Sequence, residues 1–224
     1  MAKQGLKKKI LLLWIAALVI VGIVLFGPAG SMDYWEAWVY MAVLFVPAFF
    51  VVAYFLKKDP AFLERRIKTK EKEATQGAII KVATIIFIIG FLIPGFDQRF
   101  GLSEVPMEVA LAGNLFVFLG YVLIFLVFRE NSYAGRTVVV EKGQKVISSG
   151  PYAIVRHPMY VGTLVLYIAT PFALGSYIAV PLFLLLIPFI VLRILNEEEV
   201  LRRSLPGYTE YCKKTKYRLV PFIW

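Results

Sequence analysis

Residues Pro158 to Leu192 read PMYVGTLVLYIATPFALGSYIAVPLFLLLIPFIVL and contain no charged side chain. As one straight helix, this run of 35 residues would be about 52 Å long at a rise of about 1.5 Å per residue. The hydrocarbon core of a bilayer is only about 30 Å thick. The run is therefore too long for one crossing, and we expect it to fold back on itself.

Three residues mark the place of this reversal: Pro171, Gly175 and Pro181. Proline removes a helical hydrogen-bond donor and clashes with the preceding turn, whereas glycine permits a sharp change of direction. We expect two short helices, at about 158–174 and 177–195, that form a tight helical hairpin.

The rest of the chain is also dominated by apolar runs. Hydrophobic residues make up 59% of the sequence and charged residues 18%, and the mean hydropathy is +0.73, which excludes an ordinary water-soluble protein. Four further uncharged runs are long enough to cross a bilayer when flanking lysines extend towards the surface. They are Ile10 to Gly27, Ala37 to Leu56, Val82 to Phe96 and Val109 to Phe128. The sequence therefore predicts an all-α integral membrane protein with about six transmembrane helices.

The positions of the basic residues predict the orientation. Six crossings place both termini on one side of the membrane. If that side also holds the 57–81 and 129–157 loops and the tail from Arg193, it contains 24 of the 25 lysines and arginines, all but Arg99. Basic residues accumulate on the cytoplasmic side, so we expect both termini to be cytoplasmic. We attribute the formal charge of +10 to these cytoplasmic basic residues. The sequence shows no nucleic-acid-binding motif.

The first apolar run has a second interpretation, as a cleaved signal peptide. Lys7 to Lys9 precede the run, and the small residues Ala29 to Ser31 follow it. Its removal would leave five crossings and would place the basic tail and the basic 57–73 loop on opposite sides. The charge distribution therefore favours a retained span.

Residues 129–157 form the longest polar connection between apolar runs. Thr137 to Val140 and Lys145 to Ser148 are rich in β-branched residues, and Glu141 to Gln144 between them have the composition of a turn. We expect a partly extended cytoplasmic loop here.

Polar residues gather at both mouths of the predicted hairpin. Arg156, His157 and Tyr160 stand at its start, and Arg193 with Glu197 to Glu199 stand at its end. Because the hairpin brings its two mouths together, these side chains are expected at one membrane depth. Arg193 and Glu197 lie one helical turn apart and so share a face. Ionisable groups at the edge of a span are functional candidates, and the sequence predicts a polar pocket reached by a water-soluble ligand from one side and an amphipathic molecule from the lipid.

Taken singly, these residues have ordinary structural explanations. A lone histidine such as His157 is more often a helix-cap or interface group than a catalyst, Arg156 fits a basic membrane anchor, and a run of glutamates often forms a solvated helix face. With one histidine and one cysteine, Cys212, neither a multi-histidine nor a cysteine-based metal site is expected.

As an ordered set, the motifs of residues 130–224 resemble those of the isoprenylcysteine carboxyl methyltransferase and phospholipid methyltransferase superfamily of membrane enzymes. The resemblance is carried by Gln144-Lys145-Val146-Ile147, Gly150-x-Tyr152, Arg156-His157-Pro158-x-Tyr160-x-Gly162, Glu197-Glu198 with Leu201, and Tyr208-x-x-Tyr211 through Arg218 to Pro221. Pro151 after Gly150 departs from the pattern and stiffens that turn.

The resemblance implies S-adenosylmethionine as the cofactor and a lipophilic or lipid acceptor. Residues 1–128 would then provide four spans, and residues 129–224 the cytoplasmic loop, hairpin and tail of the methyltransferase region. The cofactor would be bound by Gln144, Lys145, Val146, Ile147, Tyr152, His157, Pro158, Met159, Tyr160, Glu197 and Glu198. Which of the two glutamates makes the principal contact stays open.

The same mapping implies that Arg193 faces the acceptor. Methyl transfer from a sulfonium is an in-line displacement, so the protein mainly supplies alignment and exclusion of water. A carboxylate acceptor is already nucleophilic and would be oriented by Arg193. An amine acceptor needs a base, for which His157 and a glutamate are candidates.

Two alternatives remain at this stage. Membrane sterol reductases share a similar C-terminal cofactor region, so a nicotinamide-dependent reductase is possible. A small transporter or assembly factor is the non-enzymatic alternative, but the sequence shows no inverted repeats and no polar pathway through its first four spans.

Overall fold

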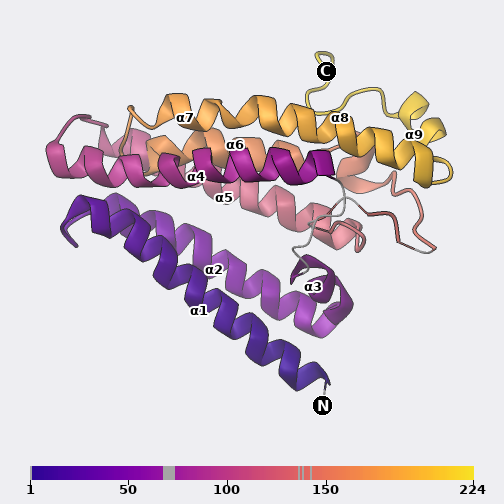
Figure 1. Ribbon diagram of the computed structural model, residues 1–224, viewed down its shortest axis with the longest axis horizontal. Coiled ribbons are helices and arrows are strands. Elements are labelled where there is room, and N and C mark those ends of the chain that lie inside the picture. The colour runs from indigo at the N-terminus through magenta and orange to yellow at the C-terminus, as the bar shows by residue number, and fades with distance from the viewer. Residues whose placement is uncertain (1, 68–73, 136, 138, 142) are drawn as a thin grey trace.

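The computed structural model describes residues 2–67, 74–135, 137, 139–141 and 143–224. In this part of the chain every regular element is a helix (Figure 1). In chain order they are α1 (Ala2–Ala29), α2 (Trp35–Lys58), α3 (Pro60–Ile67), α4 (Ala74–Phe100), α5 (Met107–Glu130), the 3-10 helix η1 (Gly150–Ala153), α6 (Pro158–Ala173), α7 (Val180–Leu184), α8 (Leu186–Ser204) and α9 (Tyr208–Lys214).

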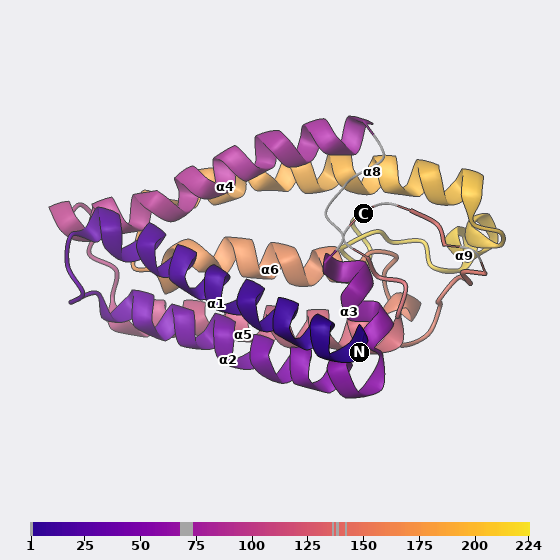
Figure 2. The ribbon, with the colours of Figure 1, turned by 60° about the horizontal axis from the view of Figure 1, so that its bottom comes forward.

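Within the described residues, five helical stretches are long and apolar enough to cross a membrane, and they confirm the all-α membrane fold. They are Gln4–Ala29, Trp35–Lys58, Gln76–Phe100, Met107–Glu130 and Val180–Ser204. With 16 residues, α6 is about 24 Å long, shorter than a typical span, although it runs between the two ends of the bundle as the others do (Figure 2). The sixth crossing therefore stays a prediction.

The expected reversal lies where Pro171, Gly175 and Pro181 predicted it. α6 ends at Ala173, Gly175 adopts a left-handed conformation with φ of 68°, and the amide of Ser176 donates to the carbonyl of Pro171 at 2.9 Å. The returning arm begins at Val180, later than the expected 177. It is also interrupted, because α7 is a single turn and a break at Leu185 separates it from α8. The two arms also diverge, since α6 packs mainly along α5 and α8 along α4.

Close contact between α5 and α6 depends on glycine. A Cβ atom on Gly162 would lie 2.7 Å from Cγ1 of Ile124 and 2.9 Å from the carbonyl oxygen of Gly120. Small residues let membrane helices approach in this way. The contact holds α6, and hence the Arg156-His157 motif before it, against α5.

Gly162→Ala is therefore expected to destabilise the protein by about 1–3 kcal/mol, the usual cost of overpacking. Thermal unfolding in detergent measures the change. The matched control is Gly27→Ala, because Gly27 is also helical and a Cβ there meets nothing within 4 Å. Equal melting temperatures for the two variants would contradict the assigned α5–α6 contact.

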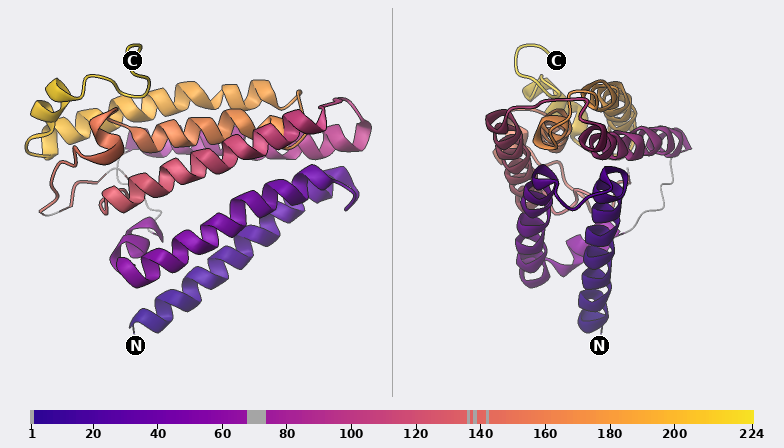
Figure 3. Two further views of the ribbon diagram at one scale, coloured as in Figure 1. Left: turned by 180° about the vertical axis from the view of Figure 1, so that it is seen from behind. Right: turned by 90° about the vertical axis from the view of Figure 1, so that its left-hand side faces the viewer.

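The first two helices form a pair that crosses the others at an angle and diverges from them towards the N-terminus (Figures 1 and 3). On the diverging side, α3 packs Phe62 and Leu63 against Phe55 of α2 and against Phe125 and Phe128 of α5. This short helix thus packs between the ends of α2 and α5, beside the segment that follows α5.

Both chain ends lie at similar positions along the long axis of the bundle, on the side of the molecule where α3 is found (Figure 2). The reversal after α6 and the α1–α2 and α4–α5 connections lie at the opposite end (Figure 2). The placement of both termini on the cytoplasmic side stays a prediction. Part of the basic 57–81 loop, residues 68–73, lies outside the described residues.

The expected extended pieces of the 129–157 loop do not form strands among its described residues; Arg136, Val138 and Lys142 lie outside them. The turn between the two pieces is present, with the amide of Gln144 bonded to the carbonyl of Glu141 at 3.0 Å. An isolated two-stranded ribbon is marginal in stability. Here the apolar side chains of Val139, Val146 and Ile147 instead line a pocket.

Candidate functional site

A pocket between the 131–152 segment, the start of α6, the end of α8 and α9 gathers nearly all of the predicted site residues. Those that line it are Gln144, Lys145, Val146, Ile147, Tyr152, His157, Pro158, Met159, Tyr160, Arg193 and Glu197. Its remaining walls are both polar and apolar, so it suits a ligand that has both kinds of surface. Glu198 alone among the predicted set is absent from the lining.

Glu198 is buried among basic side chains. The residue is 3% exposed. Oε1 accepts from Nε of Arg156 at 2.7 Å and lies 3.2 Å from Nε2 of His157, while Oε2 accepts from Nε of Arg218 at 3.2 Å. Arg202, one turn further along α8, adds an ion pair at 3.6 Å. The carboxylate therefore joins α8, the start of α6 and the C-terminal tail.

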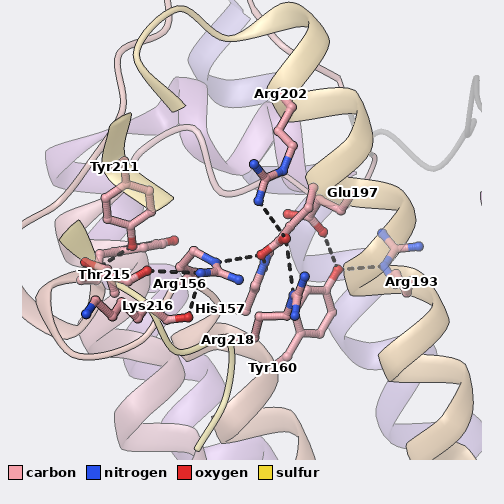
Figure 4. A network of polar contacts seen from close by, with 12 residues as sticks. Arg156, His157, Tyr160, Arg193, Glu197, Arg202, Tyr211, Thr215, Lys216 and Arg218 are labelled. Carbon is pink, nitrogen blue, oxygen red and sulfur yellow. Dashed lines mark hydrogen bonds and ion pairs between the residues drawn. The ribbon is translucent and has the colours of Figure 1, made fainter. Parts of the chain in front are cut away.

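The tail is also bonded directly to the backbone of the motif. The amides of Arg156 and His157 donate to the carbonyls of Tyr217 and Arg218, at 2.9 and 3.0 Å. The guanidinium of Arg156 donates in turn to the carbonyls of Thr215 and Lys216, at 3.1 and 2.7 Å (Figure 4). Arg156 thus serves as a structural tie, and its own side chain is only 7% exposed.

Tyr160 links the two charged residues of α8 that do face the pocket. Its hydroxyl donates to Oε2 of Glu197 at 2.6 Å and accepts from Nε of Arg193 at 2.8 Å (Figure 4). The shared helix face predicted for Arg193 and Glu197 is what allows one tyrosine to reach both.

Gln76 of α4 also hydrogen-bonds Arg193. The amide oxygen of Gln76 accepts from Nη1 of Arg193 at 2.8 Å, and its amide nitrogen donates to the Arg193 carbonyl at 3.1 Å. Gln76 is fully buried. The sequence analysis missed it, and its only signal was an uncharged polar residue just before an apolar run.

Aromatic hydroxyls form the opposite wall. Tyr152 accepts from the side-chain amide of Asn131 at 2.9 Å, and its carbonyl accepts from the hydroxyl of Tyr211 at 2.8 Å. Burial raises the pKa of Tyr152 to about 12, so its hydroxyl stays protonated and keeps a proton to donate. The hydroxyl of Tyr208 is buried and has no hydrogen-bond partner among the described residues. Asn131 was also missed by the sequence analysis.

A second, mainly apolar cavity of about 460 Å³ adjoins the pocket between α4, α5, α6 and α8. Its walls include Ala83 and Phe87 of α4, Ile124 of α5, Tyr167 of α6 and Phe189 of α8. The two cavities share Gly135, Met159, Tyr160 and Arg193. Arg193 and Tyr160 therefore stand at the junction of the first pocket, whose walls are both polar and apolar, and a mainly apolar cavity.

Part of the chain is similar to a known protein family. Residues 109–206 match the model of the phospholipid methyltransferase family, which covers the α5–α8 part of the pocket. The mouse Delta(14)-sterol reductase TM7SF2 is 31% identical over 106 residues, 43% of this chain but 25% of the reductase, so the chain spans about a quarter of that relative.

The fold is shared over nearly the whole chain with a solved structure. The eukaryotic intramembrane Ras methyltransferase ICMT, an isoprenylcysteine carboxyl methyltransferase, superposes with a TM-score of 0.50 over 97% of this chain and 85% of the other, at 17% identity. At that identity the likeness concerns the fold alone. The chain is thus similar to the phospholipid methyltransferase family over residues 109–206 and shares its fold with an intramembrane methyltransferase.

Proposed function

We propose that this protein transfers a methyl group from S-adenosylmethionine to a lipophilic acceptor at the membrane boundary. The observation that carries the proposal is the junction at Arg193 and Tyr160, where a pocket with mixed polar and apolar walls adjoins a mainly apolar cavity between the helices. Such a junction lets a water-soluble donor and a membrane-borne acceptor meet while water is excluded.

The pocket residues fit S-adenosylmethionine chemically. The carboxylate of Glu197 is suited to accept from an ammonium group or ribose hydroxyls. The hydroxyl of Tyr208, which no described residue bonds, offers a further hydrogen bond to a ligand. Val146, Leu201 and Leu205 supply apolar surface for a purine ring. When bound, the cofactor would supply an electrophilic sulfonium methyl group.

Of the two glutamates, we therefore assign Glu197 to the cofactor and Glu198 to the support of the pocket wall. Arg193 is assigned to the acceptor, because its guanidinium lies at the entrance from the apolar cavity and is held there by Gln76 and Tyr160. His157 borders the pocket, and its Nε2 lies beside Glu198. We assign it a role as a base only for an acceptor that must lose a proton.

The acceptor is proposed to be either an isoprenylcysteine-like carboxylate or a phospholipid amine. The family match favours a phospholipid and the shared fold a prenylated acid. Incubating the purified protein with methyl-labelled S-adenosylmethionine and a panel of prenylcysteines, phosphatidylethanolamine and small lipophilic acids or thiols is expected to label one class. Labelling no higher than that of heat-inactivated protein across the panel would contradict the proposal.

Glu197→Gln is expected to weaken cofactor binding roughly tenfold or more, the usual effect of losing a charge-assisted hydrogen bond. Calorimetry with S-adenosylhomocysteine measures the change. Glu199→Gln is the matched control, because Glu199 lies on the same helix but is exposed and paired with Arg203. Equal affinities for the two variants would remove Glu197 from the proposed site.

A nicotinamide-dependent reductase is the second candidate, favoured by the 31% identity to a sterol reductase over 106 residues. The two candidates differ in the cofactor that the pocket binds. We also propose that the pocket end of the bundle is cytoplasmic, supported by the basic residues of the tail and of the 57–81 loop.

A further inference from the structure

The end of the tail, residues 220–223, presents apolar side chains outward, and we call this segment the tail tip. Phe222 is 88% exposed and Ile223 80%. The segment is nevertheless folded, because the amides of Arg218, Leu219 and Val220 all donate to the carbonyl of Trp224, at 2.8 to 3.2 Å. Its conformation is defined, although both large side chains have little protein cover.

The backbone at Phe222 is held in an unfavourable conformation. Its φ is 68°, a left-handed value that costs a non-glycine residue on the order of 1 kcal/mol or more. The aromatic ring is turned outward and touches only the ring of Tyr217 among the aromatic side chains, with 5.3 Å between ring centroids. This strained backbone holds the Phe222 ring away from the protein, which suggests that the ring contacts a surface outside it.

The tail tip lies beside the helices rather than beyond their ends. Leu219, the residue before it, packs against Tyr160 of α6 and Ile190 and Ile194 of α8. Ile190 belongs to the apolar part of the membrane-spanning stretch, about one turn inside Arg193. In Figures 1 and 3 the tail projects sideways from the bundle, set back from the end where α9 lies. The tip is therefore placed where the acyl chains of the bilayer meet the headgroups.

The residues around the tip have the chemistry of a membrane interface. Lys216, between α9 and the tip, is exposed, as are Lys213 and Lys214 at the end of α9, and such lysines suit anionic headgroups. Arg218 stacks over the ring of Trp224, with 5.0 Å to its centroid, and tryptophan is enriched at the boundary of the bilayer. Charge and apolar surface are thus arranged as in segments that lie in the interface plane.

We infer that the tail tip inserts into the leaflet at the pocket end, with Phe222 and Ile223 as a shallow lipid anchor. The occupant of this surface is the bilayer itself. Because the tail is bonded through Tyr217 and Arg218 to the backbone of Arg156 and His157, the anchor also holds the wall of the pocket against the membrane. This inference does not depend on which cofactor the pocket binds.

Site-specific fluorescence tests the anchor. In a Cys212→Ser background, single cysteines introduced by Phe222→Cys and Ile223→Cys carry a nitrobenzoxadiazole label, and Glu210→Cys on the exposed face of α9 is the control. Each protein is placed as a single copy in nanodiscs of phosphatidylcholine and phosphatidylglycerol, with or without nitroxide-bearing lipids.

Labels at 222 and 223 are expected to emit at shorter wavelength than the label at 210 and to be quenched several-fold more strongly by lipid nitroxides. Emission at 222 and 223 that matches the water-exposed control would overturn the inference. A blue shift without quenching by nitroxide lipids would overturn it as well, because the surface would then be covered by protein. None of the three positions is buried, so the variants are expected to retain the wild-type elution profile.

Discussion

Glu198→Ala is expected to lower the melting temperature of the protein by on the order of 10 °C. The substitution leaves the guanidinium of Arg156 buried without its carboxylate and removes the group that joins Arg156, His157 and Arg218. Breaking a buried ion pair from one side costs about 3–5 kcal/mol, and about 1 kcal/mol shifts the midpoint of a domain of this size by a few degrees.

Thermal unfolding in detergent, followed by tryptophan fluorescence, measures the shift. Glu199→Ala provides the control one residue away, because that glutamate is exposed and its ion pair with Arg203 lies on the surface, where such pairs contribute little. Glu198→Gln keeps the size of the side chain and is expected to fall between the two. A melting temperature for Glu198→Ala equal to that of Glu199→Ala would refute the structural role assigned to Glu198.

Arg193→Lys is expected to lower the rate of methyl transfer roughly 100-fold or more, the usual loss when one preorganised donor is removed from a reaction site. Lysine keeps the charge but cannot bond both the hydroxyl of Tyr160 and the amide oxygen of Gln76 with the planar geometry of a guanidinium. The charge at the junction of the two cavities would then no longer be held in one position.

Cofactor affinity separates this effect from general damage to the pocket. Because Glu197 and Tyr160 are retained, Arg193→Lys is expected to bind S-adenosylhomocysteine with nearly wild-type affinity while transfer falls. Arg203→Lys, in an exposed ion pair on the same helix, is expected to change neither quantity. Loss of cofactor affinity in parallel with transfer would instead assign Arg193 to the cofactor.

The sequence predicted the elements of this fold that depend on local rules. Uncharged runs marked the long helices, because backbone groups in lipid must bond internally and helices satisfy that need. Pro171, Gly175 and Pro181 marked the reversal that brings His157 and Glu197 to one end of the bundle. The divergence of the two arms was not predictable, since it depends on α6 packing against α5 through Gly120 and Gly162.

The candidate site was predictable where residues lie close in sequence or share a helix face. Glu197 and Glu198 are separated by about 100° around a helix, and the four-residue spacing from Arg193 already favoured Glu197 as the residue beside it. The contribution of Gln76 needed the tertiary structure, because 117 residues separate it from Arg193. The same holds for the tail, which contributes only backbone carbonyls to its bonds with Arg156 and His157, so these bonds leave no pattern in its side chains.

Equilibrium binding to the purified wild-type protein in nanodiscs tests the central claim most directly, with S-adenosylhomocysteine and reduced nicotinamide dinucleotide phosphate titrated separately under the same conditions. We expect S-adenosylhomocysteine to bind, labelled S-adenosylmethionine to compete for the same site, and the nicotinamide cofactor to leave that site unoccupied. Binding of the nicotinamide cofactor without binding of S-adenosylhomocysteine would contradict the proposed methyltransferase and favour the reductase.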